Sequence, residues 1–204
     1  MKRLALLVSL CLIAACGADR AAAAEIAYGI AGFAWPGMSL AKLRTKVPPG
    51  MRLLCGTDRE LPPMEDADRT GLKVPRELAE AGVDRCGIFA PTGDKKHQYQ
   101  VQQTKLADNP ADFWVLILVD GNGVQRVVQL EMAQSNTSFT STLDYFGQTF
   151  GAPQQRSTSA ARWKNGRDEA IVTASSDGRM QIFLIDNELQ GLLTQRITAA
   201  HPQQ

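Results

Sequence analysis

The chain has 204 residues, 44% of them hydrophobic, and its 22 lysines and arginines nearly balance its 21 aspartates and glutamates. This composition can build a packed core, and the length suits one medium domain or two fused halves. The near-neutral charge argues against nucleic acid, or an anionic membrane surface, as an electrostatically bound partner.

The N-terminus has the pattern of an export signal. Lys2 and Arg3 precede the apolar stretch 4–15, which ends in small residues. Two cations, a short apolar run and small residues are typical of a secretory signal peptide. The run is shorter than the roughly 20 apolar residues that cross a bilayer as a helix. We therefore predict export.

Two cleavage sites are compatible with this signal. Ile13-Ala14-Ala15-Cys16 resembles the lipobox of bacterial lipoproteins, in which the cysteine is lipidated and becomes the first residue. This cut makes 1–15 the signal, and two acyl chains suffice for a stable anchor. In such lipoproteins Gly17 after the cysteine favours the outer membrane, facing the periplasm. The alternative is a cut after Ala24, which makes 1–24 the signal and releases a periplasmic or secreted protein. We favour Cys16, because it directly follows the apolar run.

Cysteine usage agrees with an oxidising destination. Cys11 leaves with the signal and Cys16 is lipidated or removed, so Cys55 and Cys86 remain as a pair. We predict that they form a disulfide. Metal binding with His97 as a third donor is the alternative, but the chain lacks a C-x-x-C pair. We predict neither a metal site nor a cofactor.

The mature chain is predicted to begin with a flexible tether over 16–32, followed by a single globular domain over 33–200. Ser39 is placed to cap a short helix that ends at Pro48-Pro49-Gly50. A strand over 51–55 follows. The polar stretch 56–85 reads as a long crossover with a helix over 75–81, and a Cys55–Cys86 bond would join its two ends.

Strands dominate the next part of the chain. Short strands are predicted over 88–90 and 97–101. The continuous apolar run 113–119 indicates a central strand that is buried on both faces. Asp120-Gly121-Asn122-Gly123 predicts a tight turn into a return strand over 124–133.

The remaining sequence predicts a helix, two hairpins and a helix. The first helix carries apolar residues over 139–150, and Gly151 is placed to end it. Hairpins follow over 162–172 and 177–185. Asp186 or Asn187 opens the last helix. We predict an α+β fold: an antiparallel meandering sheet with short helices on one face, and an alternative division into similar halves over 33–134 and 135–200.

Three short motifs resemble the SmpA/OmlA and β-lactamase-inhibitor-like group of small exported α+β domains. These are Gly37-Met38-Ser39 at a helix entry, Gly151-Ala152-Pro153 at a helix end, and Trp163 in the following strand. The resemblance implies an envelope protein that acts as a binding or assembly factor rather than as an enzyme.

Candidate functional residues are few. Ser39 and Lys42 have the S-x-x-K spacing of a serine hydrolase, which is the alternative function, although the companion motifs are absent and a helix cap explains Ser39. Trp35, Trp114 and Trp163 each lie in or beside a predicted strand. They are predicted to pack the core or, alternatively, to form a face that binds a partner.

Overall fold

The computed structural model describes Gly29 and residues 33–201, so the export signal, Cys16 and Ala24 lie outside the described residues. The described part has helices α1 (Leu40–Lys46), α2 (Asp66–Gly71), α3 (Arg76–Glu80), α4 (Phe139–Phe150) and α5 (Asn187–Ala200), and a 3₁₀ turn over Asn136–Ser138. Its strands are β1 (Arg52–Cys55), β2 (Val83–Pro91), β3 (Tyr99–Val101), β4 (Thr104–Leu106), β5 (Asn109–Val119), β6 (Gln125–Ser135), β7 (Gln155–Arg156), β8 (Ala160–Lys164), β9 (Asp168–Ala174) and β10 (Arg179–Asp186).

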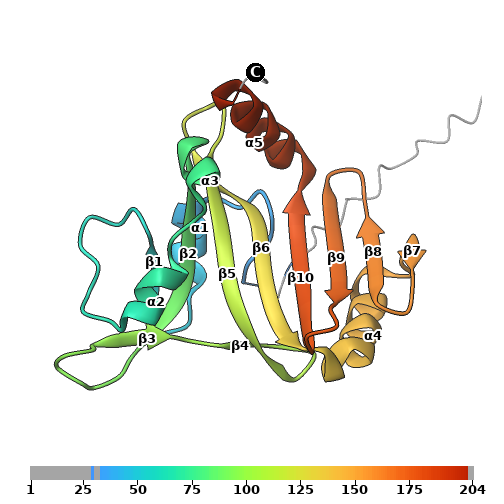
Figure 1. Ribbon diagram of the computed structural model, residues 1–204, viewed down its shortest axis with the longest axis horizontal. Coiled ribbons are helices and arrows are strands. Elements are labelled where there is room, and N and C mark those ends of the chain that lie inside the picture. The colour runs from blue at the N-terminus through green and yellow to red at the C-terminus, as the bar shows by residue number, and fades with distance from the viewer. Residues whose placement is uncertain (1–28, 30–32, 202–204) are drawn as a thin grey trace, which may run out of the picture.

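All of these strands belong to one antiparallel sheet in the order β1-β2-β5-β6-β10-β9-β8-β7, with β3 paired to β2 and β4 to β5 (Figure 1). The predicted α+β class is confirmed. The stretch before α4 supplies β1 to β6 and the stretch after it supplies β7 to β10. Their last strands, β6 and β10, pair with each other in the middle of the sheet and form a seam between the two stretches.

Local sequence explains where the helices begin and end. The Ser39 hydroxyl accepts a hydrogen bond from the Lys42 amide at the start of α1. The Asp186 carboxylate caps α5 by accepting from the amides of Glu188 and Leu189, both at 3.0 Å. Gly151 ends α4 with φ at 82°. Both caps provide side-chain acceptors for amides that lack a partner inside the helix.

The main core lies between one face of the sheet and helices α1 and α4. Leu43 of α1 and Phe146 of α4 are both 0% exposed and join a cluster with inward-facing residues of the strands. We call this side the covered face. Phe146 packs edge-on against Trp163, with ring centroids 5.5 Å apart.

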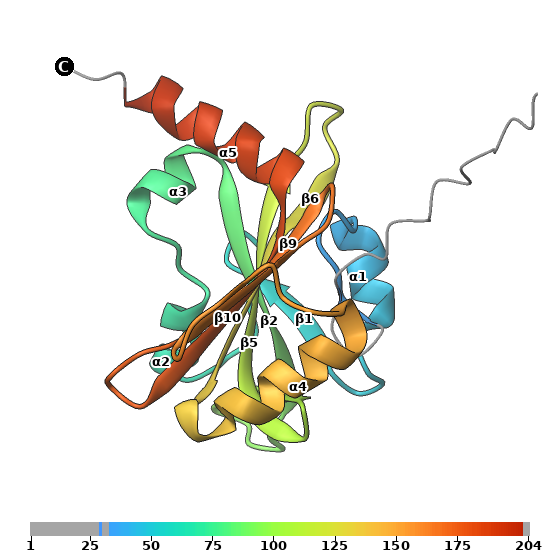
Figure 2. The same ribbon diagram turned by 90° about the vertical axis from the view of Figure 1, so that its right-hand side faces the viewer.

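Helices also lie against the other face, in contrast to the prediction that they share one face. Leu116 and Leu118 of β5 pack with Leu189 and Leu193 of α5 and with residues of α3, while the last residue of α2, Gly71, lies against Trp114 of β5. Figure 2 shows α1 and α4 on one side of the sheet and α2 and α3 on the other, with α5 across its end. The reason lies in the 116–118 run, whose apolar side chains point to both faces and require cover on both.

The predicted disulfide between Cys55 and Cys86 is present. The two residues are direct partners in the β1–β2 pair, and both are buried in the main core. The bond therefore fastens an edge strand to its neighbour and closes the crossover 56–82, which holds α2 and α3. No helix in the described part of the chain is long and apolar enough to cross a membrane.

Candidate functional site

One part of the sheet is left without a helix. Alternate side chains point away from α1 and α4 on strands β6, β10, β9 and β8, and they form a surface on the other side of the sheet. Among the described residues, no helix packs on the middle of this surface. The register places five residues of adjacent strands in one row: Trp114, Glu131, Phe183, Ile171 and Arg162. All five are half-buried. We call this surface the open face.

Trp114 marks the boundary of the open face near α2. The Arg85 guanidinium lies 4.7 Å from its ring centroid and also pairs with Glu131 at 3.1 Å. An added Cβ at Gly71 or Gly87 would come within 2.5 or 2.7 Å of the indole. Only glycine at these two positions leaves room for the ring, so the two glycines allow the observed orientation of the Trp114 side chain.

Charges on the open face are already paired within the protein. Besides the Arg85–Glu131 pair, Arg162 and Glu169 form an ion pair at 2.6 Å. The hydrogen bond that Arg162 donates to Glu169 raises the pKa of Arg162. Between these pairs lie the side chains of Phe183 and Ile171. On this row, two apolar side chains therefore lie between two ion pairs.

The other two tryptophans have different surroundings. Trp163 is 1% exposed and its indole N–H donates to the Gly151 carbonyl at 2.8 Å, so it packs the core. Trp35 is half-buried beneath the Lys42 ammonium, which lies 4.7 Å from its ring centroid. The structure does not bring the three rings together, and Trp35 and Trp114 are half-buried whereas Trp163 is buried.

A second feature is a cavity of about 630 Å³ at the end of the sheet where α5 begins. We call it the terminal pocket. Four segments far apart in sequence line it: the turn before α1, the β5–β6 turn, the β8–β9 turn and the first turns of α5. The lining residues are Trp35, Pro36, Gly37, Asp120, Gly121, Asn122, Arg126, Arg167, Asp168, Glu188, Leu189 and Leu192.

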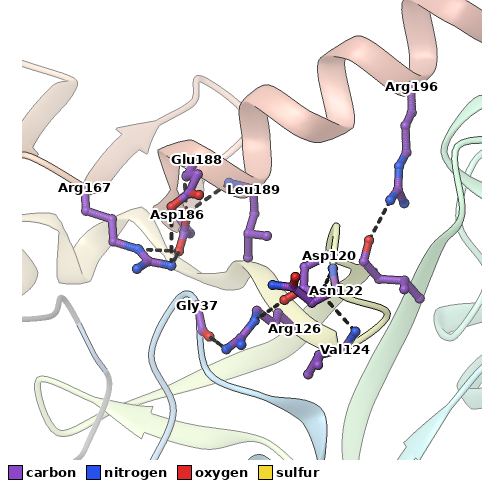
Figure 3. Close-up of polar contacts among 11 residues, drawn as sticks. Gly37, Asp120, Asn122, Val124, Arg126, Arg167, Asp186, Glu188, Leu189 and Arg196 are labelled. Atoms are coloured by element: carbon purple, nitrogen blue, oxygen red, sulfur yellow. Dashed lines mark hydrogen bonds and ion pairs between the residues drawn. The ribbon is translucent and has the colours of Figure 1, made fainter.

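The β5–β6 turn holds one arginine of the terminal pocket (Figure 3). Asp120 Oδ1 accepts from the amides of Asn122 and Val124, which confirms the predicted turn, while its Oδ2 accepts from Arg126 Nε at 2.6 Å. The Arg126 hydrogen bond is the main reason that the pKa of Asp120 is lowered. Arg126 Nη1 also donates to the Gly37 carbonyl at 3.0 Å.

The second arginine is held by the residue that caps α5. Arg167 Nε donates to Asp186 Oδ2 at 2.8 Å, and its Nη2 lies 2.6 Å from the same oxygen. Asp186 is 0% exposed, and its hydrogen bond is the main reason that the pKa of Arg167 is raised. A buried carboxylate therefore serves both the helix and the guanidinium.

Gly37 lies between the two arginines. Its φ is 78°, and an added Cβ would lie 2.7 Å from Asp186 Oδ2 and 3.0 Å from Arg167 Nη2. The turn before α1 can therefore approach the Asp186–Arg167 pair only with glycine at this position.

The alternatives that involve catalysis or metal binding gain no geometric support. Ser39 serves as the cap of α1, and the Lys42 ammonium lies over Trp35. Among the described residues, one group of three metal-binding types gathers closely: Cys55, Asp84 and Cys86. Its two sulfurs are bonded to each other, and His97 pairs with Glu65 instead.

The sequence pattern did not predict the terminal pocket. Arg126, Arg167 and Asp186 share no motif or spacing, and only the sheet topology brings them together. The one available signal was the pair of turn sequences at Asp120–Gly123 and Asn165–Gly166, because both hairpin turns lie at the same end of the sheet.

Comparison of the whole chain with family models, with curated proteins and with solved structures finds no match.

Proposed function

We propose that this protein is an exported binding factor of the bacterial envelope, anchored by a lipid at Cys16, that holds a protein partner on its open face. Export and anchoring rest on the N-terminal sequence and agree with the Cys55–Cys86 disulfide, since such bonds persist in oxidising compartments. The observation that carries the binding function is the row of half-buried residues from Trp114 to Arg162 on an uncovered sheet.

The shape and charge of this face favour a folded protein over a small molecule or a polyanion. Small ligands occupy concave cavities, and the cavity at the end of the sheet does not include Phe183 or Ile171. Arg85 and Arg162 are paired one to one with Glu131 and Glu169, so the face has no cluster of excess positive charge of the kind that a nucleic acid or an anionic lipid surface requires. A partner with an apolar centre and a mixed polar rim is complementary to it.

Site-specific photocrosslinking in intact envelopes tests the partner. A photoreactive residue in place of Phe183 should yield one discrete crosslinked protein, because the side chain points to the partner. The same residue in place of Gln148, which is exposed on α4, is the matched control and should not yield it. Equal crosslinking from both positions, or none from Phe183, would refute binding through the open face.

The anchor has its own test. The intact mass of the mature protein from membranes should correspond to a chain that begins at Cys16 and carries a diacylglycerol. A mass that begins at Glu25 would exclude the anchor while leaving the open face as a binding surface for a released protein.

A further inference from the structure

We propose that the terminal pocket binds a small organic carboxylate whose apolar part lies against α5. This site is separate from the open face and does not depend on the function proposed above. Its volume of about 630 Å³ falls in the range of small-molecule sites in proteins.

The pocket lining contains more carboxylates than guanidiniums, but the two guanidiniums are more exposed than the aspartates that hold them. The Arg126 and Arg167 side chains are 34% and 49% exposed, whereas those of Asp120 and Asp186 are 10% and 0% exposed. Asp168 is also buried. The aspartates are therefore less accessible than the guanidiniums, and the exposed charged side chains of the lining are Arg126, Arg167 and Glu188.

Both guanidiniums keep donors for a ligand. Arg126 uses Nε and Nη1, and Arg167 uses Nε and Nη2. Within residues 33–201, Nη2 of Arg126 and Nη1 of Arg167 donate no hydrogen bond. Asp120 and the Gly37 carbonyl already hold Arg126, and Asp186 holds Arg167, so little side-chain entropy is lost when an anion binds. Each guanidinium therefore offers one nitrogen that can donate a charge-assisted hydrogen bond to a carboxylate.

The rest of the lining determines the class of anion. Leu189 and Leu192 on α5, with Pro36 and Trp35 opposite, supply an apolar wall that inorganic phosphate cannot use. Glu188, with 81% of its side chain exposed, adds a negative charge at the rim. That charge disfavours a dianion more than a monoanion. An amphipathic monocarboxylate satisfies both conditions.

The test is an NMR titration of the mature chain with 3-phenylpropionate, with 3-phenylpropionamide and with inorganic phosphate. The carboxylate should produce saturable shifts at the Gly37 and Leu189 amides and at the Nε–H groups of both arginines. The neutral amide should bind at least about tenfold more weakly, since it loses the charge-assisted hydrogen bonds.

Two variants address the site without removing its buried charges. An added Cβ at Gly121 meets no atom within 4 Å, so Gly121→Phe should fill the pocket and weaken binding at least about tenfold. Gly147 on α4 has equal space, and Gly147→Phe should bind like the parent chain. Glu188→Gln should tighten binding by about twofold, as expected for one exposed charge.

Each contrary result overturns the proposal. These results are the absence of a saturable shift with the carboxylate, equal affinity for the amide, equal affinity for phosphate, and unchanged binding in Gly121→Phe. Circular dichroism and thermal midpoints confirm that the variants are folded. Phe183 crosslinking in the Gly121→Phe chain should be unaffected, which keeps this test distinct from that of the open face.

Discussion

Two rows of residues from the same five strands meet opposite surroundings. On the covered face, Phe113, Met132, Ile182, Val172 and Ala161 follow one another in register, and each is at most 2% exposed. One residue along each strand, the row of Trp114, Glu131, Phe183, Ile171 and Arg162 is half-buried. Strand alternation separates the two rows, and the position of the helices decides which one becomes core.

The largest expected effect comes from one substitution made in both rows. Phe113→Ala should lower the free energy of unfolding by about 3–5 kcal/mol, because it leaves a cavity in a closed core. Phe183→Ala should lower it by about 1 kcal/mol, because its side chain buries less apolar surface. Urea unfolding monitored by circular dichroism measures both. Equal losses in the free energy of unfolding would show that Phe183 is a core residue, which would contradict the proposed interface.

The disulfide holds the edge of the covered face. Reduction, or the double change Cys55→Ser and Cys86→Ser, should cost about 3–4 kcal/mol for a sequence separation of 31 residues. Urea midpoints with and without reductant provide the measurement. The double variant should not respond to reductant, and a parent chain that also fails to respond would contradict a stabilising bond.

At the end of the sheet where α5 begins, the packing of the turn before α1 against Asp186 requires glycine at position 37. Gly37→Ala should cost about 1–3 kcal/mol, because it forces a side chain into a left-handed conformation and against Asp186. Gly50 has φ at 83° with no atom within 4 Å of an added Cβ, so Gly50→Ala should cost only the conformational part, about 1–2 kcal/mol. Thermal unfolding of the two variants separates steric conflict from backbone preference. Identical midpoints would show that Asp186 moves aside freely.

The smallest effect is electrostatic and belongs to the exposed β5–β6 turn. Because Arg126 lowers the pKa of Asp120 below its ordinary value of 3.8, the pair stabilises the fold above that pH and loses this contribution as the pH falls through the folded-state pKa. A carboxyl ¹³C titration should show the pKa of Asp120 rising towards 3.8 in Arg126→Met. An unchanged titration would assign the shift to the turn amides instead.

The sequence predicted most elements and little of their arrangement. The turn at Asp120–Gly123, the cap at Ser39 and the end of α4 follow from local chemistry and were confirmed. Helix α2 was missed, because it is six residues long and has no buried residue to create a pattern. The apolar run 113–119 indicated burial on both faces, but nothing local revealed which helices supply it.

The candidate sites were less predictable than the fold. Trp114 was identified as an aromatic on a strand, yet its neighbours Phe183 and Ile171 come from hairpins more than fifty residues later. Alternation alone could not show that their face lacks a helix. The terminal pocket requires knowledge of strand order, since its arginines lie on different hairpins. Local patterns identify individual side chains, whereas pairing across the β6–β10 seam determines which of them meet.

That seam also has a kinetic consequence. Most neighbouring strands of the second stretch are joined by tight hairpins, whereas β6 and β10 pair although α4, β7, β8 and β9 lie between them in the chain. Contacts distant along the chain form late, because ordering the intervening loop costs entropy before the pairing stabilises it. We expect each stretch to assemble first and the seam to close last. Conservative substitutions at Leu130 and Leu184 should then speed unfolding while leaving the refolding rate unchanged. A slower refolding rate would instead make the seam the nucleus of the fold.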